Sequence, residues 1–92
     1  MFATSCLWKP RHLSDKLYAM TAEQKFLSSF GKRLATIRKR KGITQEKLAD
    51  LIEVHRTYIG FIEQGKRNPS IANVYKIAKA LKVSLSDIFS DL

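Results

Sequence analysis

The sequence has few of the residues that build disulfide frameworks, metal sites or membrane spans. Its 92 residues include one cysteine, Cys6, and two histidines, His12 and His55. A single cysteine cannot close an intrachain disulfide, and together with two distant histidines it matches no familiar zinc-site spacing. No apolar run approaches the ~20 residues that a transmembrane helix needs. We therefore expect a cytoplasmic protein without a metal ion and without a membrane-spanning segment.

The sequence also lacks the motifs of catalysis. It contains no glycine-rich phosphate loop, and no Ser/His/Asp set that a small helical core could orient. We therefore expect no enzymatic activity, no cofactor and no small-molecule ligand.

Acidic residues are scarce: eight Asp and Glu stand against 17 Lys and Arg, giving a net charge of +9. This balance favours a polyanionic partner, either nucleic acid or an acidic membrane surface. The basic residues are spread over several predicted helices instead of opposing one apolar face, which argues against a membrane-surface peptide.

Length and composition indicate one domain with a single core, because 45% of the residues are hydrophobic and 27% are charged. Residues 1–20 show no sustained period and form a separate N-terminal extension, whereas 21–92 form the domain. Met20 is a possible alternative start, since Thr21 and Gln24 after it make a capping box. The extension is either without a role, an arm that packs on the domain or touches DNA, or a targeting peptide. We favour the first, and its apolar stretch is too short for export.

Apolar residues recur at helical spacing in five segments, and no segment alternates as a half-buried strand does. The first helix is expected over 22–41, with Gly42 as its C-cap. Thr44, Ser70 and Ser84 are expected to cap the second, fourth and fifth helices. The expected inward positions, in chain order, are Phe26, Phe30, Leu34, Ile37, Leu48, Ala49, Ile52, Ile59, Ile62, Val74, Ile77, Ala78 and Leu81, followed by the apolar positions Leu85, Ile88 and Phe89 of the fifth helix.

The segment 44–65 places two short helices about three residues apart. Such short helices cannot bury each other alone, so they must pack on a larger helical core and present one face outward. On the second of them that face carries Arg56, Thr57, Gly60 and Phe61. Two crossed helices with an exposed, donor-rich second helix are typical of proteins that enter a DNA major groove.

The residues that carry a family resemblance are Thr44-Gln45-Glu46, Leu48-Ala49, Ile59 and the run from Ile62 to Ser70. They resemble the helix-turn-helix domain of the phage Cro and repressor family, over about 30–89. The runs 56–59 and 83–89 are further similar to controller proteins of restriction–modification systems. The resemblance implies an all-α, five-helix Cro/repressor-like domain. Glu53 departs from the family, which often has glycine in this turn; a positive φ there would cost about 1 kcal/mol.

This resemblance implies a sequence-specific transcriptional regulator that binds double-stranded DNA. One short recognition helix contacts only a few base pairs, so we expect a homodimer on a two-fold operator. A restriction–modification controller is the preferred subtype. The alternatives are a phage-type repressor and an antitoxin of a toxin–antitoxin pair.

Candidate contacts to base edges lie on the third helix. Arg56 can pair with guanine O6 and N7, with a nonspecific phosphate contact as the alternative. Thr57 suits a thymine or a phosphate. Phe61 could contact thymine methyl groups or pack against the first helix.

Candidate phosphate contacts surround these positions. Gln45 opens the second helix, and the resemblance assigns it a contact to the DNA backbone. His55 lies near the start of the third helix. Tyr58 could bind a phosphate or serve the fold. Lys66 and Arg67 follow the third helix, with a solvated basic loop as the alternative.

Two further expectations concern structure. The resemblance implies an ion pair between Arg38 on the first helix and Glu63 on the third, which would fix the recognition helix. The fifth helix is too short to hide all its apolar side chains, so Leu85, Ile88 and Phe89 are expected to contribute to the dimer interface.

Overall fold

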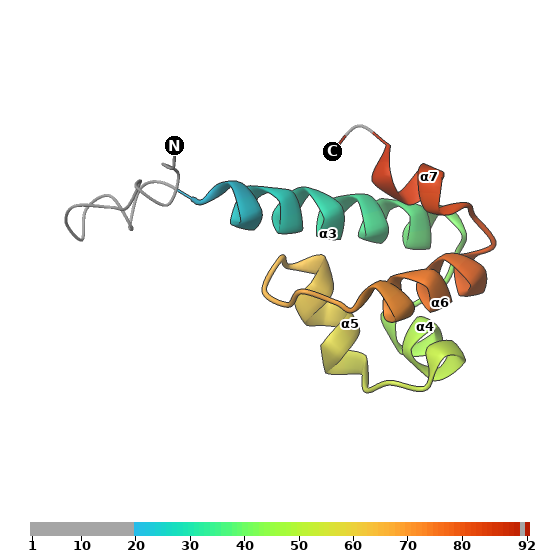
Figure 1. The fold of residues 1–92 in the computed structure, drawn as a ribbon. Helices are drawn as coiled ribbons and strands as arrows, with labels where there is room; N and C mark the ends of the chain where they lie inside the picture. The colour runs from blue at the N-terminus through green and yellow to red at the C-terminus, as the bar shows by residue number, and fades with distance from the viewer. Residues whose placement is uncertain (1–19, 91) are drawn as a thin grey trace.

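The structure is a computed structural model that describes residues 20–90 and 92, and that part of the chain contains five helices and no strand (Figure 1). The helices are α3 (Ala22–Arg40), α4 (Gln45–Ile52), α5 (Arg56–Glu63), α6 (Ile71–Leu81) and α7 (Leu85–Phe89). The expected all-α, five-helix domain is confirmed. The extension expected over residues 1–20 lies outside the described residues except for Met20.

Each of the helices α3 to α7 is preceded by a residue whose side chain accepts a hydrogen bond from the first turn. Thr21 and Gln24 form a capping box at α3, and Ser84 and Asp87 form another at α7. The expected caps at the starts of α4 and α6 are also present, because Thr44 accepts from the Lys47 N–H and Ser70 accepts from that of Asn73. His55 caps α5 through its imidazole ring. The helix starts are therefore encoded locally, by one polar side chain at each boundary.

Left-handed residues follow the ends of α3, α4 and α6. Lys41 is the C-cap of α3, and Gly42 follows it with φ +73°, so the expected cap lies one residue earlier than the glycine. Glu53 after α4 has φ 61° and Lys82 after α6 has φ 59°. The turn of the motif thus has the positive φ that glycine adopts freely, and Glu53 bears a strain of about 1 kcal/mol.

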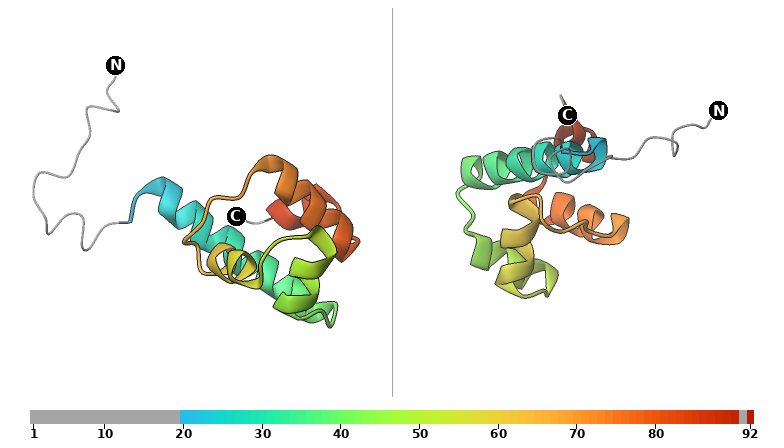
Figure 2. Two further views of the ribbon diagram at one scale, coloured as in Figure 1. Left: turned by 90° about the horizontal axis from the view of Figure 1, so that it is seen from below. Right: turned by 90° about the vertical axis from the view of Figure 1, so that its left-hand side faces the viewer.

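The helices form two layers. Figure 2, in its right-hand view, has α3 and α7 above and α4, α5 and α6 beneath. α3 packs against α5 and α7, while α4 packs against α5 and α6. The core between them consists of Phe30, Leu34, Ile37, Leu48, Ala49, Ile52, Ile59, Ile62, Val74, Ile77, Ala78, Leu81 and Ile88. These include all the expected inward positions of the first four helices except Phe26.

Phe26 was wrongly expected in the core, since its side chain is 46% exposed. It lies near the start of α3, which extends beyond the other helices at this end (Figure 1). Its ring still stacks on Phe30 and Phe89, with centroid distances of 6.5 and 6.4 Å. The helical spacing places Phe26 on the core-facing side of α3, but helices α4 to α7 do not extend far enough to cover it.

Candidate nucleic-acid interface

The outer face of α5 is open to solvent. Its inner residues Ile59 and Ile62 are fully buried, whereas Arg56, Thr57 and Phe61 are exposed. Phe61 keeps 44% of its side-chain surface exposed, so packing against α3 does not account for it. The structure therefore brings the three expected base-contacting residues together on one free helix face.

The C-terminal end of α5 lies directly against the backbone of α3. A Cβ atom on Gly31 would meet the carbonyl oxygens of Ile62 at 2.4 Å and Glu63 at 2.5 Å. Gly65, with φ +77°, approaches Ser28 in the same way, and a Cβ there would be 2.8 Å from the Ser28 Cα. Sequence reasoning missed this close crossing. A glycine inside an otherwise helical segment is the signal that could have indicated it.

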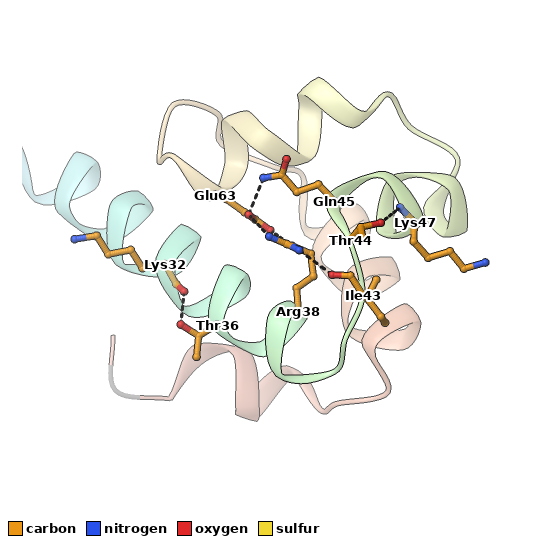
Figure 3. A network of polar contacts seen from close by, with 8 residues as sticks. All are labelled: Lys32, Thr36, Arg38, Ile43, Thr44, Gln45, Lys47 and Glu63. Atoms are coloured by element: carbon orange, nitrogen blue, oxygen red, sulfur yellow. Dashed lines mark hydrogen bonds and ion pairs between the residues drawn. The ribbon is translucent and has the colours of Figure 1, made fainter.

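Next to the crossing of α3 and α5, a polar network joins α3, α4 and α5 (Figure 3). Arg38 donates from Nε to Glu63 Oε2 at 2.6 Å and from Nη2 to Oε1 at 3.0 Å. Its Nη1 donates to the Ile43 carbonyl at 2.7 Å, and Gln45 Nε2 donates to Glu63 Oε1 at 2.9 Å. The side chains of Arg38 and Glu63 are largely buried, so this pair holds α5 against α3 in a defined register.

The same network orients the Gln45 side chain. One N–H of its amide donates to Glu63 Oε1, and the second N–H of the same nitrogen is left to donate to a phosphate. The backbone N–H groups at the start of α4 remain as donors there. An open hollow next to them is lined by Arg38, Thr44, Gln45, Glu46 and Arg56.

His55 and Thr57 are coupled at the start of α5. The His55 Nδ1 atom accepts from the Thr57 N–H at 3.2 Å and lies 2.8 Å from Thr57 Oγ1. This ring caps the helix, and both side chains remain exposed beside Arg56.

Tyr58 and Arg67 meet at the other edge of the face. The Arg67 guanidinium carbon lies 5.1 Å from the centroid of the Tyr58 ring. The Tyr58 hydroxyl accepts from Asn73 Nδ2 on α6 at 2.9 Å. Lys66 is exposed in the same loop, and its N–H donates to the Phe61 carbonyl. Asn73 is a residue that sequence reasoning did not single out.

The apolar residues of α7 divide between two environments. Ile88 is 0% exposed and faces the core, so it was wrongly expected to contact a partner subunit. Leu85 and Phe89 are 37% and 38% exposed, and Leu92 is exposed beyond the helix. On α6, Ile71 and Tyr75 are more exposed still; Ile71 lines the same hollow as Phe89, whereas Tyr75 lines another one beside the end of α4. Because α7 is so short, the side that carries Ile88 packs inward, and only the side that carries Leu85 and Phe89 can contact a partner.

Asp87 fixes the position of α7. Arg33 on α3 donates from Nε and Nη2 to the Asp87 carbonyl at 3.0 and 2.8 Å. The backbone N–H of Ser84, the Ser84 hydroxyl and the charge of Arg33 all lower the pKa of the Asp87 carboxyl. The carboxylate is thus held ionised at the start of the helix, where the dipole favours negative charge.

Metal ligands in a cluster and membrane-spanning helices are both absent from the described part of the chain. No group of three or more His, Cys, Asp or Glu side chains that could hold a metal ion occurs in residues 20–90 and 92. None of the helices α3 to α7 is long and apolar enough to cross a membrane.

A protein-family model described as helix-turn-helix matches residues 34–88, which include all of α5 and its exposed face. Among curated proteins, the control protein C.MunI from a Mycoplasma species is 45% identical over 64 residues, covering 68% of this chain and 86% of that protein. The control protein C.BamHI from Bacillus amyloliquefaciens is 48% identical over 60 residues, covering 64% of this chain and 74% of that protein.

A solved structure agrees with these sequence matches. The restriction-modification controller protein C.AhdI from Aeromonas hydrophila superimposes with a TM-score of 0.67 at 43% identity. The match covers 68% of this chain and 96% of that one.

Proposed function

The chain belongs to the helix-turn-helix family and is a DNA-binding regulator of transcription, and from this premise we propose that it acts as a homodimer on a two-fold operator, as the controller of a restriction–modification system. It is a binding protein and not an enzyme. Its relatives named as controllers support the subtype. A regulator that binds bacterial DNA would act in the cytoplasm.

The observation that carries this proposal is the free outer face of α5 on a rigidly held helix. The backbone crossing at Gly31 and the Arg38–Glu63 pair leave α5 little freedom to tilt. A side chain on such a helix meets a base edge without losing much conformational entropy, which favours specific contacts. Arg56 would pair with a guanine, while Thr57 and Phe61 would meet thymine methyl groups.

Phosphate contacts would flank this helix on both sides. The backbone N–H groups at Gln45 and the side chain of His55 would meet one stretch of the DNA backbone. Tyr58, Lys66 and Arg67 would meet another. These contacts fix the orientation of α5 in the groove and make binding depend on salt.

The dimer would form through the exposed apolar ridge of α6 and α7. Leu85 and Phe89 are exposed on α7, and Ile71 at the start of α6 is exposed and lines the same hollow as Phe89. Burial against the same ridge of a second copy would be isologous, as two-fold symmetry requires. The two α5 helices would then lie about one DNA turn, ~34 Å, apart. We propose residues 21–92 as the helix-turn-helix DNA-binding domain.

Selection of duplexes from a random pool by the purified protein tests the proposal directly. Recovery of a two-fold symmetric consensus, with an affinity whose logarithm falls linearly with the logarithm of salt concentration, is expected. Affinity that does not respond to salt, or recovery without any consensus, would contradict sequence-specific DNA binding.

A charged variant of the ridge tests the dimer. Ile71→Lys and Leu85→Lys should give folded monomers that bind half-sites weakly, as measured by sedimentation and fluorescence anisotropy. Phe89 is avoided because it stacks on Phe30 at 5.6 Å and also serves the fold. Tyr75→Lys, on the adjoining face of α6, shows whether the effect is confined to the ridge. An unchanged dimer in both ridge variants would refute this interface.

A further inference from the structure

An apolar groove runs along the first turns of α3 and reaches the end of α7. Two hollows share Phe26, Leu27 and Asn68 in their walls, and together they form this groove. One end of it lies at Thr21, where the chain enters α3, and the other end lies at Phe89. The hollow at the Phe89 end has a volume of about 180 Å³, which is large enough for one aromatic side chain.

The groove leaves aromatic surface in contact with water. Phe26 is 46% exposed although its ring stacks on those of Phe30 and Phe89, and Met20 just before the helix is about as exposed. The start of α3 extends beyond the other helices, so none of α4 to α7 covers it (Figure 1). Removing apolar surface from water is favourable in proportion to its area, so a further apolar segment is expected to bind here.

Residues 1–19 are attached to the described chain at the end of this groove. They join it at Met20, next to Thr21, and this attachment gives them a high effective concentration at the groove. The stretch of α3 from Thr21 to Phe30 is ~14 Å long, at about 1.5 Å per residue. An extended chain advances about 3.3 Å per residue, so roughly four residues cover that stretch. The segment is therefore long enough to turn back and reach the Phe89 end.

The side chains of this segment match those of the groove. Trp8, the only tryptophan of the chain, and Leu13 are apolar side chains that the groove can accept. The segment also carries three basic residues against one acidic residue, so it is positively charged. Glu23, which is exposed in the wall of the groove at the Thr21 end, provides the opposite charge.

We propose that residues 1–19 dock in this groove of their own chain, with Trp8 in the hollow between Phe26 and Phe89 and a basic side chain beside Glu23. An indole ring there would pack against phenyl rings that already stack on one another. The extension is then an arm that packs on the domain, one of the three alternatives that the sequence left open. Ile71 lines both the groove and the proposed dimer contact, so the arm lies at the margin of that contact. Docking requires no DNA and is independent of the proposed function.

Tryptophan fluorescence of the full chain, without DNA, tests the docking, because Trp8 is the only tryptophan. In the folded protein its emission should lie at shorter wavelength than in urea. Acrylamide should quench it several-fold less than it quenches N-acetyltryptophanamide. Phe26→Ser should move the emission to longer wavelength and restore quenching. Leu51→Ser is the matched control, since Leu51 is 47% exposed but lines another hollow, and it should leave the emission unchanged.

Emission of a fully solvated indole in the folded wild type would overturn the proposal, and so would equal effects of Phe26→Ser and Leu51→Ser. Thermal melting provides a second measurement in the full chain. Trp8→Ser should lower the melting temperature of the wild type but not that of Phe26→Ser, because the two side chains contribute through one contact. If Phe26→Ser is unfolded, the wild-type emission and the melting of Trp8→Ser decide the result, and an unchanged melting temperature would contradict docking.

Dilution distinguishes the groove of the same chain from that of a second copy. Docking within one chain does not depend on protein concentration, so the emission should stay constant on dilution. Emission that moves to longer wavelength on dilution would place the arm on a partner and overturn docking within the chain. Emission of a solvated indole that shifts only when duplex DNA is added would assign the arm to DNA and also overturn it.

Discussion

Gly31 on α3 lies directly beneath the carbonyl oxygen of Ile62 on α5, so close that a Cβ atom would approach that oxygen to 2.4 Å. Separations below 3.0 Å are essentially never seen for real Cβ atoms. The recognition helix is therefore seated on the backbone of α3, and its position in the domain depends on a missing side chain.

Gly31→Ala should destabilise the domain by about 1–3 kcal/mol, because the neighbouring backbone must move to admit the methyl group. Gly60→Ala is the matched control within a helix, since its nearest neighbour would be 3.8 Å away, on the flexible Gln45 side chain. That control should be stabilising by roughly 0.5–1 kcal/mol through helix propensity. Urea unfolding followed by circular dichroism measures both. Equal stability of the two variants would contradict the crossing.

Breaking the pair between Arg38 and Glu63 should cost on the order of 3 kcal/mol, because the remaining charge is left largely buried. Arg38→Met and Glu63→Leu each remove one partner. The double variant should lose much less than the sum of the single losses, since neither charge then remains. Chemical unfolding of all three variants gives the coupling free energy, and strictly additive losses would argue against it.

Glu53→Gly should stabilise the domain by about 1 kcal/mol, because φ 61° strains a residue with a side chain and not glycine. For a domain of this size that corresponds to a melting temperature about 4–8 °C higher. Lys82→Gly, at φ 59°, should behave alike. Asp50→Gly, within α4, should instead destabilise by about 0.3 kcal/mol, the difference between the helix propensities of Asp and Gly. A lower melting temperature for Glu53→Gly would mean that the side chain compensates for the strain.

Asp87 should make the domain less stable in acid. Its pKa is lowered in the folded state by the Ser84 N–H, the Ser84 hydroxyl and Arg33, so its contribution is complete above the unfolded pKa of about 3.9 and is lost as the pH falls through the folded value. Asp87→Asn should therefore differ from the wild type near neutral pH and approach it in acid. Urea midpoints across this range measure the difference. Ser84→Ala should make the urea midpoint depend less on pH in acid. A difference between Asp87→Asn and the wild type that stays constant at all pH values would disprove the linkage.

Arg56→Ala should lose discrimination at one base pair of each half-site, by about 1–3 kcal/mol, because a bidentate guanine contact is removed. Lys66→Ala should instead weaken binding to all sequences about equally. Anisotropy titrations with the selected operator and single-base variants of it compare the two. Uniform weakening by Arg56→Ala would assign that residue to a phosphate.

Residues near each other in the chain determined what the sequence could predict. Hydrophobic period and polar caps depend on neighbours within about four positions, so helix starts such as those at Thr21, Thr44 and Ser84 follow from the amino-acid order alone. The spacing within 44–65, with the family resemblance, likewise predicted the motif and the outward face that carries Arg56. These features persist because local hydrogen bonding and amphipathic burial support the same helices.

Tertiary structure decided which side chains meet. Arg38 and Glu63 are separated by 25 positions, and the resemblance alone suggested their pairing. Asn73 and Tyr58, separated by 15, had no such guide. The inward turn of Ile88 and the exposure of Phe26 depend on where neighbouring helices end, which helical period does not encode. The closeness of α3 and α5 at Gly31 is set by how two backbones cross, and that crossing is a property of the packed core as a whole.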